Sequence, residues 1–263
     1  MSEDPLRIHV RPRLETPALL LAFEGFNDAG ESATSALRFL NGALRTAPLA
    51  DLDPEEFYDF TVRRPMVSLE NSRTRSLSWP ANELRFGTLA ARSGEREVVT
   101  LLGIEPHLRW RRFTDRIVEY AEEMGVVEVV LLGAYLADVV YSQPVRVTGF
   151  ASDPDDLRHL GVEGSSYEGP TGIIGVLGQR FIARGLRVVS FWAGLPHYIN
   201  ASPNPRGSLA LLQILSRHLD FDLDLEPIRL HALEFEERIS RLVAEDPELA
   251  EYVRQLKKRE FAG

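Results

Sequence analysis

The sequence predicts an α/β protein of three layers, in which helices cover both faces of a central mixed, mostly parallel sheet. Two patterns support this fold class. Several short runs are apolar on successive residues, which is typical of strands buried on both faces. Amphipathic segments with a helical repeat lie between those runs. In addition, a chain of 263 residues with 44% hydrophobic residues can bury one large core.

Six short apolar runs are expected to form the strands of this sheet. They are 18–23, 57–62, 98–104, 126–133, 145–150 and 186–192. The segment 64–89 is rich in arginine, serine and asparagine, and we expect it to form a hairpin or a long loop on this scaffold.

Four segments have apolar residues at spacings of three and four, which predicts four helices in the core. They are 29–44, 110–124, 170–184 and 209–219. Asn27 and Asp28 precede the first helix, where their side-chain oxygens can accept from free backbone N–H groups. Pro170 in the first turn and Gly185 after the last residue follow the usual preference at the ends of a helix.

The last part of the chain differs in character from the rest. Its apolar residues nearly follow a heptad, and Asp246-Pro247 starts a second helix. We therefore expect a core domain over 1–225 and a C-terminal helical hairpin over 226–263. This hairpin packs either on the core domain or on a neighbouring subunit.

Charge and composition exclude several classes of function. A net charge of -9 and a pI near 5.3 argue against nucleic-acid or membrane partners, because phosphates would be repelled. The absence of cysteine excludes disulfides, thiol nucleophiles and cysteine-ligated metals. We find no secretory signal and no membrane-spanning run, so we expect a cytoplasmic protein. The histidine spacings fit no zinc motif, and we expect neither a metal nor a cofactor.

Polar residues follow several of the expected strands. Asn27 and Asp28 lie after the first, Glu105 after the third and His197 after the sixth. Because the carboxyl ends of parallel strands share one edge of a sheet, these groups are expected to converge there. Glu105, Asp28 and His197 are the candidate catalytic residues. The alternative is that Asp28 caps a helix, Glu105 stabilises the N-terminus of the helix expected over 110–124, and His197 makes structural hydrogen bonds.

Two further segments contribute candidates. The loop 167–172 has two glycines beside a helix N-terminus, which is typical of an anion cradle or of a strained turn capped by Thr171. Arg64 is placed to clamp a carboxylate or phosphate, or to form an ion pair across a subunit contact. The residues expected to line a ligand site are Asn27, Asp28, Arg64, Glu105, Tyr167, Glu168, Gly169, Thr171, Gly172, His197, Tyr198 and Asn204.

Taken together, these motifs resemble the proteasome assembly chaperone 2 family, in its bacterial branch with a C-terminal helical extension. Each motif alone is weak, whereas their number and order make the resemblance specific. It covers roughly residues 15 to 220, and the segments that carry it are Phe23-x-Gly25-Phe26-Asn27-Asp28-Ala29-Gly30, Arg63-Arg64-Pro65, Gly103-Ile104-Glu105-Pro106, Tyr167-Glu168-Gly169-Pro170-Thr171-Gly172, Pro196-His197-Tyr198 and Ser202-Pro203-Asn204-Pro205.

The resemblance implies an α/β fold similar to purine nucleoside phosphorylases and peptidyl-tRNA hydrolases, and no established enzyme activity. It also implies a homo-oligomer whose partners are proteasome subunits or another protein complex. Some relatives dock through a C-terminal tail with tyrosine in the penultimate position, where this chain has Ala262. This tail is therefore not expected to dock in that way.

Two hypotheses follow for the function. The first is a non-enzymatic oligomeric assembly or binding protein similar to the proteasome assembly chaperones. The second is a small-molecule-binding enzyme, a hydrolase or phosphorylase of nucleoside-like compounds, with a pocket at the carboxyl ends of the strands. The geometry of that edge separates the two, because the enzyme needs carboxylates that are free to act beside His197.

Overall fold

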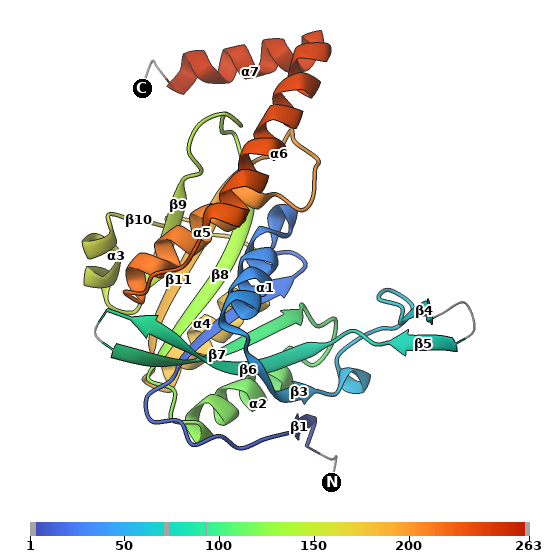
Figure 1. Ribbon diagram of the computed structural model, residues 1–263, viewed down its shortest axis with the longest axis vertical. Helices are drawn as coiled ribbons and strands as arrows, with labels where there is room; N and C mark the ends of the chain where they lie inside the picture. Colours follow the sequence, from blue (N-terminus) through green and yellow to red (C-terminus); the bar gives the residue numbers. More distant parts are fainter. Residues whose placement is uncertain (1–3, 71–73, 93, 261–263) are drawn as a thin grey trace.

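The computed structural model describes residues 4–70, 74–92 and 94–260, whose arrangement is shown in Figure 1. Ala262, which replaces the penultimate tyrosine found in some relatives, lies outside the described residues. A nine-stranded sheet has the order β1-β3-β6-β7-β2-β8-β11-β9-β10, and β4 and β5 form a second sheet. The strands are β1 Leu6–Ile8, β2 Ala18–Glu24, β3 Ala47–Leu52, β4 Met66–Glu70, β5 Thr74–Ser78, β6 Asn82–Ala91, β7 Gly94–Ile104, β8 Glu128–Ala137, β9 Val147–Ala151, β10 Glu163–Gly164 and β11 Arg187–Pro196. The helices are η1 Ala29–Glu31, α1 Ser32–Leu44, η2 Pro54–Glu56, α2 Trp110–Glu123, α3 Pro154–Leu160, α4 Ile173–Ala183, α5 Pro205–His218, α6 Glu226–Glu245 and α7 Pro247–Glu260, of which η1 and η2 are short 3-10 helices.

The centre of the large sheet is parallel and its margins are mixed. The strands β7, β2, β8 and β11 run parallel to one another, whereas β6 pairs antiparallel with β7 and β9 pairs antiparallel with β11. The carboxyl ends of the four central strands therefore lie at one edge of the sheet. Helices cover both faces, which confirms the predicted three-layer fold with a mixed sheet (Figure 1).

Each central strand is apolar on successive residues because its two faces enter two different cores. In β2, Leu19, Leu21 and Phe23 belong to the core that α2 and α4 cover. Leu20 and Ala22 belong to the core that α1 and α5 cover. All five side chains are at most 1% exposed. Alternation along a doubly covered strand thus accounts for the unbroken apolar run.

The two C-terminal helices form a third, smaller core. Its buried members are Val140, Phe235, Ile239, Val243, Val253 and Leu256. Tyr198 and Ile199, which follow β11, pack against it, and Val140 follows β8. The helical hairpin therefore contacts the loops at the carboxyl ends of two central strands of its own chain. Among the helices described, none is long and apolar enough to cross a membrane.

One predicted strand is wrong. Residues 57–62 form turns after η2 and belong to no strand. Phe57 is buried because its ring packs edge-on against Phe113, with 5.1 Å between the ring centroids. The apolar run thus reflects packing under α2. The helix predicted from Pro170 begins instead at Ile173, so the proline lies outside its first turn.

The segment 64–89 is only partly a hairpin on the scaffold. As predicted, β4 and β5 pair as a hairpin, which projects from the body of the molecule (Figure 1). The residues from Asn82 onward, however, join the central sheet as β6, beside β7 and β3. Neither this strand nor its neighbour β3 was predicted, because β6 mixes polar and apolar residues, and β3 is short, half exposed and contains Pro48.

The ring of Phe113 joins α2 to the sheet. Phe113 is fully buried against Phe23 and Phe57, so we expect Phe113→Ala to leave a cavity and lower the free energy of unfolding by about 3–5 kcal/mol. Urea titration measures this loss. Glu119→Ala, on the exposed face of the same helix, is expected to change it by less than about 0.5 kcal/mol. Equal losses in the two variants would contradict this packing.

Candidate functional site

The carboxylate of Glu105 joins three segments at the carboxyl edge of the sheet. Glu105 follows β7, and its Oε1 accepts hydrogen bonds from the Ile173 amide at 2.7 Å and the Asn27 side-chain amide at 3.3 Å. Its Oε2 accepts from the Phe26 amide at 3.3 Å. Ile173 is the first residue of α4, so the carboxylate lies at the positive end of that helix. The sequence had pointed to the N-terminus of α2 instead.

Two glycines permit this close approach. A Cβ on Gly172 would overlap the Asn27 amide and lie 2.5 Å from Glu105 Oε1. Gly25 has φ +129°, and a Cβ there would lie 3.0 Å from Glu105 Cβ. The backbone amide that was expected to receive an external anion is therefore already bound by a carboxylate of the protein itself.

Asp28 is a buried helix cap. Its side chain accepts from the Ala33 amide at 2.7 Å and the Thr34 amide at 3.3 Å, and it also accepts from the Thr34 hydroxyl. Burial raises the pKa of the Asp28 carboxyl, although these hydrogen bonds oppose the shift. Asp28 thus serves the start of α1, as the capping alternative predicted. Asn27 does not share this role, since its side chain faces Glu105.

The rest of the loop 165–172 is exposed. The Tyr167 hydroxyl donates to the Pro170 carbonyl at 2.9 Å, which closes the loop on itself. Glu168, Gly169 and Thr171 are exposed. The residue before α4 is Gly172, which makes no side-chain cap, so Thr171 does not cap this helix.

The arginine pair beside the polar segment divides between two environments. Arg63 forms a two-pronged ion pair with Glu24 at the end of β2, at 2.7 and 2.8 Å. Arg64 is exposed. Next to this ion pair, the Tyr58 hydroxyl donates to the Ile104 carbonyl and accepts from the Asn82 side-chain amide. Burial raises the pKa of the Tyr58 hydroxyl well above its ordinary value.

His197 and Tyr198 lie under the C-terminal helices. The His197 Nδ1 is 3.1 Å from Asp138 Oδ1, and its Nε2 is 3.5 Å from the Tyr252 hydroxyl on α7. The Tyr198 hydroxyl donates to the Val139 carbonyl at 3.0 Å. These residues hold the loops after β8 and β11 against α7. The His197 side chain remains 43% exposed.

Asn204 connects two loops. Its side chain accepts from the Arg206 amide at 3.1 Å and so caps α5. The backbone amide of Asn204 donates to the Gly30 carbonyl at 2.7 Å, and its backbone carbonyl accepts from the Ser32 hydroxyl at 3.2 Å. The N-termini of α1 and α5 are therefore held together by backbone and capping contacts.

Five of the expected residues form two groups at this edge. Asn27, Glu105 and Gly172 meet in one cluster, and His197 and Tyr198 meet in another with Asp138 and Tyr252. Between the sheet edge and α6 lies a cavity of about 470 Å³, whose lining includes Asp138 of the second group and the expected residue Asn204. Its walls include Val140, Leu195, Phe235, Arg206 and Glu236. Neither Asp28 nor Glu105 lines this cavity.

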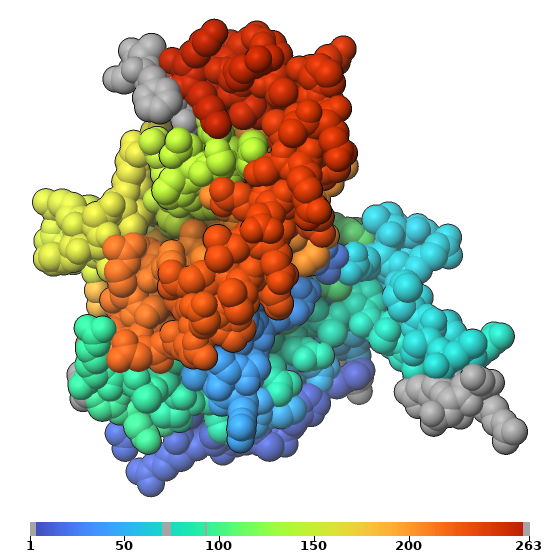
Figure 2. All heavy atoms as spheres, turned by 45° about the horizontal axis from the view of Figure 1, so that its top comes forward, coloured from blue at the N-terminus to red at the C-terminus, as the bar shows by residue number. Residues whose placement is uncertain are grey.

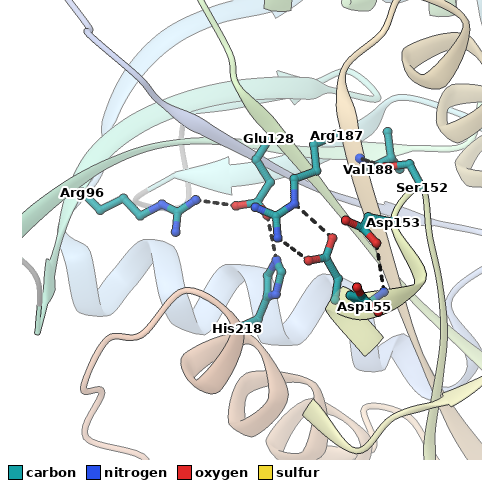
Figure 3. A network of polar contacts seen from close by, with 9 residues as sticks. Arg96, Glu128, Ser152, Asp153, Asp155, Arg187, Val188 and His218 are labelled. Atoms are coloured by element: carbon teal, nitrogen blue, oxygen red, sulfur yellow. Dashed lines mark hydrogen bonds and ion pairs between the residues drawn. The ribbon is translucent and has the colours of Figure 1, made fainter. Parts of the chain in front are cut away.

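Sequence reasoning missed a charged network at the opposite edge of the sheet, shown in Figure 3. Glu128, the first residue of β8, is 4% exposed and accepts from His218 Nε2 at 3.0 Å. Arg96 forms an ion pair with Glu128, and Arg187 lies 3.6 Å from it while pairing with Asp156. The sequence did contain a sign of this network, because Glu128 lies within the apolar run 126–133, where a charged residue needs a partner.

The pKa of Glu128 follows from this network. Burial alone would raise the pKa of its carboxyl. The hydrogen bond from His218 and the charges around the carboxylate outweigh burial, so its pKa is lowered below the ordinary glutamate value. The network joins β7, β8, β11, α3 and α5, and it stabilises the end of the sheet away from the candidate site. Among the described residues, no three acidic or histidine side chains are gathered so as to hold a metal ion.

The fold and the site define a class of α/β protein whose strand ends are tied by internal polar contacts and whose C-terminal helices pack over two of them. The chain matches the model of the PAC2 family over residues 22–243. It belongs to the PAC2 family, as the sequence motifs indicated. No curated protein sequence matches the chain.

Solved structures agree with this assignment. The chain is similar to a PAC2 family protein from Streptomyces avermitilis MA, with 40% sequence identity and a TM-score of 0.82 over 90% of this chain and 99% of that one. It is also similar to a proteasome-assembly chaperone homologue from Mycobacterium tuberculosis, with 38% identity and a TM-score of 0.79 over 90% and 99%. PbaB from Pyrococcus furiosus, an archaeal proteasome activator, shares the fold at 17% identity, with a TM-score of 0.71 over 90% and 97%.

The Glu105 cluster is expected to contribute to stability. Glu105→Ala leaves the Ile173 amide and the Asn27 side chain without an acceptor, so we expect the free energy of unfolding to fall by about 1–3 kcal/mol. Urea titration measures this loss. Glu168→Ala, in the exposed loop before the same helix, serves as the matched control and should be nearly neutral. A neutral Glu105→Ala would show that the carboxylate is not a structural tie.

The Glu128 network predicts a pH dependence. Because the folded-state pKa of Glu128 is lowered, its charge stabilises the fold above the unfolded-state pKa of about 4.3, and this contribution is lost as the pH falls through the lower folded-state pKa. We expect Glu128→Gln to lower the free energy of unfolding by about 1.5–3 kcal/mol at pH 7.

The difference between the wild type and Glu128→Gln should narrow once the pH falls below about 4. Denaturation at a series of pH values measures this difference. Glu95→Gln, at an exposed position of β7, should leave the pH profile unchanged. A difference that stays constant down to pH values of about 2 would contradict the lowered pKa.

Proposed function

We propose that this chain is a non-enzymatic assembly factor that binds other proteins, acting in the cytoplasm as a homo-oligomer. The observation that carries this proposal is membership of the PAC2 family together with the similarity to the M. tuberculosis proteasome-assembly chaperone homologue. At 38% identity over 99% of that protein, the two chains share fold and length. The partner proposed on this basis is a proteasome subunit or an assembly intermediate of the proteasome.

The geometry of the sheet edge supports binding over catalysis. A general acid or base must reach the proton that it transfers. Asp28 is 6% exposed and accepts three hydrogen bonds at the start of α1. Glu105 accepts three hydrogen bonds from two other segments. His197 belongs to the separate group with Asp138 and Tyr252, so the three candidates do not form one catalytic arrangement.

Co-purification tests the proposed partner. The tagged full-length chain, expressed at its native level, is expected to retain proteasome subunits of the same organism, and native mass spectrometry should show them in one complex. In a strain that lacks the chain, we expect unassembled proteasome subunits to accumulate. If no subunit is retained and proteasome assembly is unchanged in the deletion strain, the proposed partner is wrong.

A variant of His197 separates the binding protein from the enzyme. If the chain works by binding, His197→Ala should restore proteasome assembly in the deletion strain about as well as the wild type, because His197 is a partly exposed contact of α7. An enzyme that uses His197 as a general base would lose about 10²–10⁴-fold in rate. Failure of His197→Ala to restore assembly, with unchanged thermal stability, would favour the enzyme.

A further inference from the structure

The hairpin of β4 and β5, which we call the arm, presents an uncovered apolar face. It forms a sheet of its own and projects away from the body of the molecule (Figures 1 and 2). In its register, Val67 lies opposite Leu77 and Leu69 lies opposite Arg75. Because side chains alternate along a strand, these four residues share one face, which we call the arm face. Val67, Leu69 and Leu77 are 58%, 65% and 52% exposed.

The opposite face of the arm is mostly polar, although it carries Met66, which is 68% exposed, at the start of β4. Ser68 lies opposite Ser76, and their hydroxyl oxygens are 2.6 Å apart. An isolated two-stranded hairpin is marginally stable in water, and grouped exposed apolar side chains mark a contact surface. The arm face is thus the more apolar of the two faces and the better candidate for a contact surface.

A second apolar surface lies on α6. The buried side of this helix packs on the body of the molecule through Ile228, Phe235 and Ile239. On the other side, Leu230 and Leu233 are 51% and 54% exposed. Glu234 and Glu237 are also exposed and lie within one helical turn of these leucines, on the same side. We call Leu230, Leu233, Glu234 and Glu237 the α6 outer face.

The two faces are complementary in charge. The arm face carries Arg75 beside its apolar residues, whereas the α6 outer face carries Glu234 and Glu237. In the part of the chain that the structure describes, no ion pair engages any of these three side chains. Apolar patches flanked by opposite charges are suited to pack on each other, with the charges setting orientation.

The two faces cannot meet within one molecule. Figure 1 shows the arm projecting beyond the sheet at the right of the molecule, whereas the first turns of α6 lie beside α5 at the left. A contact between them therefore requires two copies of the chain. Because the contact joins two different surfaces, it can repeat head-to-tail from copy to copy, and it generates a ring when the rotation closes.

We infer that the arm face of one copy packs on the α6 outer face of the next copy in a closed ring. This deepens the homo-oligomer proposed above by naming its two surfaces. A failure of this inference can be told apart from a failure of the proposed binding to proteasome subunits, because self-association is measured on the purified chain in the absence of those subunits.

Cysteine cross-linking tests the contact directly, since the chain has no cysteine of its own. Leu69→Cys and Leu233→Cys proteins are mixed and treated with a short thiol-reactive cross-linker. We expect cross-linked dimers in the mixture. As the matched control, Ser76→Cys places the thiol on the opposite face of the same arm, and its mixture with Leu233→Cys should cross-link at least tenfold less. Both arm positions are outside the body, so the fold should be preserved, as thermal unfolding will check.

Charge reversal gives an independent measurement. Light scattering or native mass spectrometry of the full chain should show a ring for the wild type and at least a tenfold weaker association for Arg75→Glu. Adding Glu234→Arg and Glu237→Arg to Arg75→Glu should restore it. A monomeric wild type at high concentration would overturn the inference. Cross-links that form between Leu69→Cys copies in preference to the mixture would also overturn it, by showing that arms pair with arms.

Discussion

The hydrogen bonds of the Glu105 carboxylate are the constraint on which the rest of the sheet edge depends. One side chain binds the first amide of α4, the Asn27 side chain and the Phe26 amide, and so fixes the loops after β2 and β7 relative to α4. The positive end of the helix favours the negative charge there. The same contact explains why glycine occupies positions 25 and 172, because a side chain at Gly25 or Gly172 would meet Glu105.

This arrangement occupies polar groups that a ligand site at the carboxyl ends of the strands would use. In many open α/β sheets the carboxyl edge is a ligand site because polar groups there remain free. Here Glu105 and Asp28 satisfy backbone amides of the protein, and the C-terminal helices pack over the loops after β8 and β11. Exposed apolar side chains lie at this edge, at Phe26, Leu136 and Tyr167, and also on the arm and on α6. A protein that binds other proteins through its periphery fits this distribution.

Features of the fold that depend on local patterns could be predicted from the sequence. Successive apolar residues identified β2, β7, β8 and β11, since each enters two cores. The sequence could not distinguish Phe57, buried under α2, from a residue in a strand, because burial leaves the same pattern in both. It also placed Glu105 at the wrong helix. The nearest helix along the chain is α2, whereas the bond to Ile173 joins residues 68 positions apart, a relationship that only the tertiary fold creates.

The most direct test of this account is the hydrogen exchange of the Ile173 amide, followed by NMR. As the first residue of α4 this amide has no partner within its helix, so protection has to come from Glu105. The account predicts slow exchange in the wild type and fast exchange after removal of the Glu105 side chain, while amides inside α4 change little. Exchange in the wild type as fast as in the exposed residues of the preceding loop would contradict it.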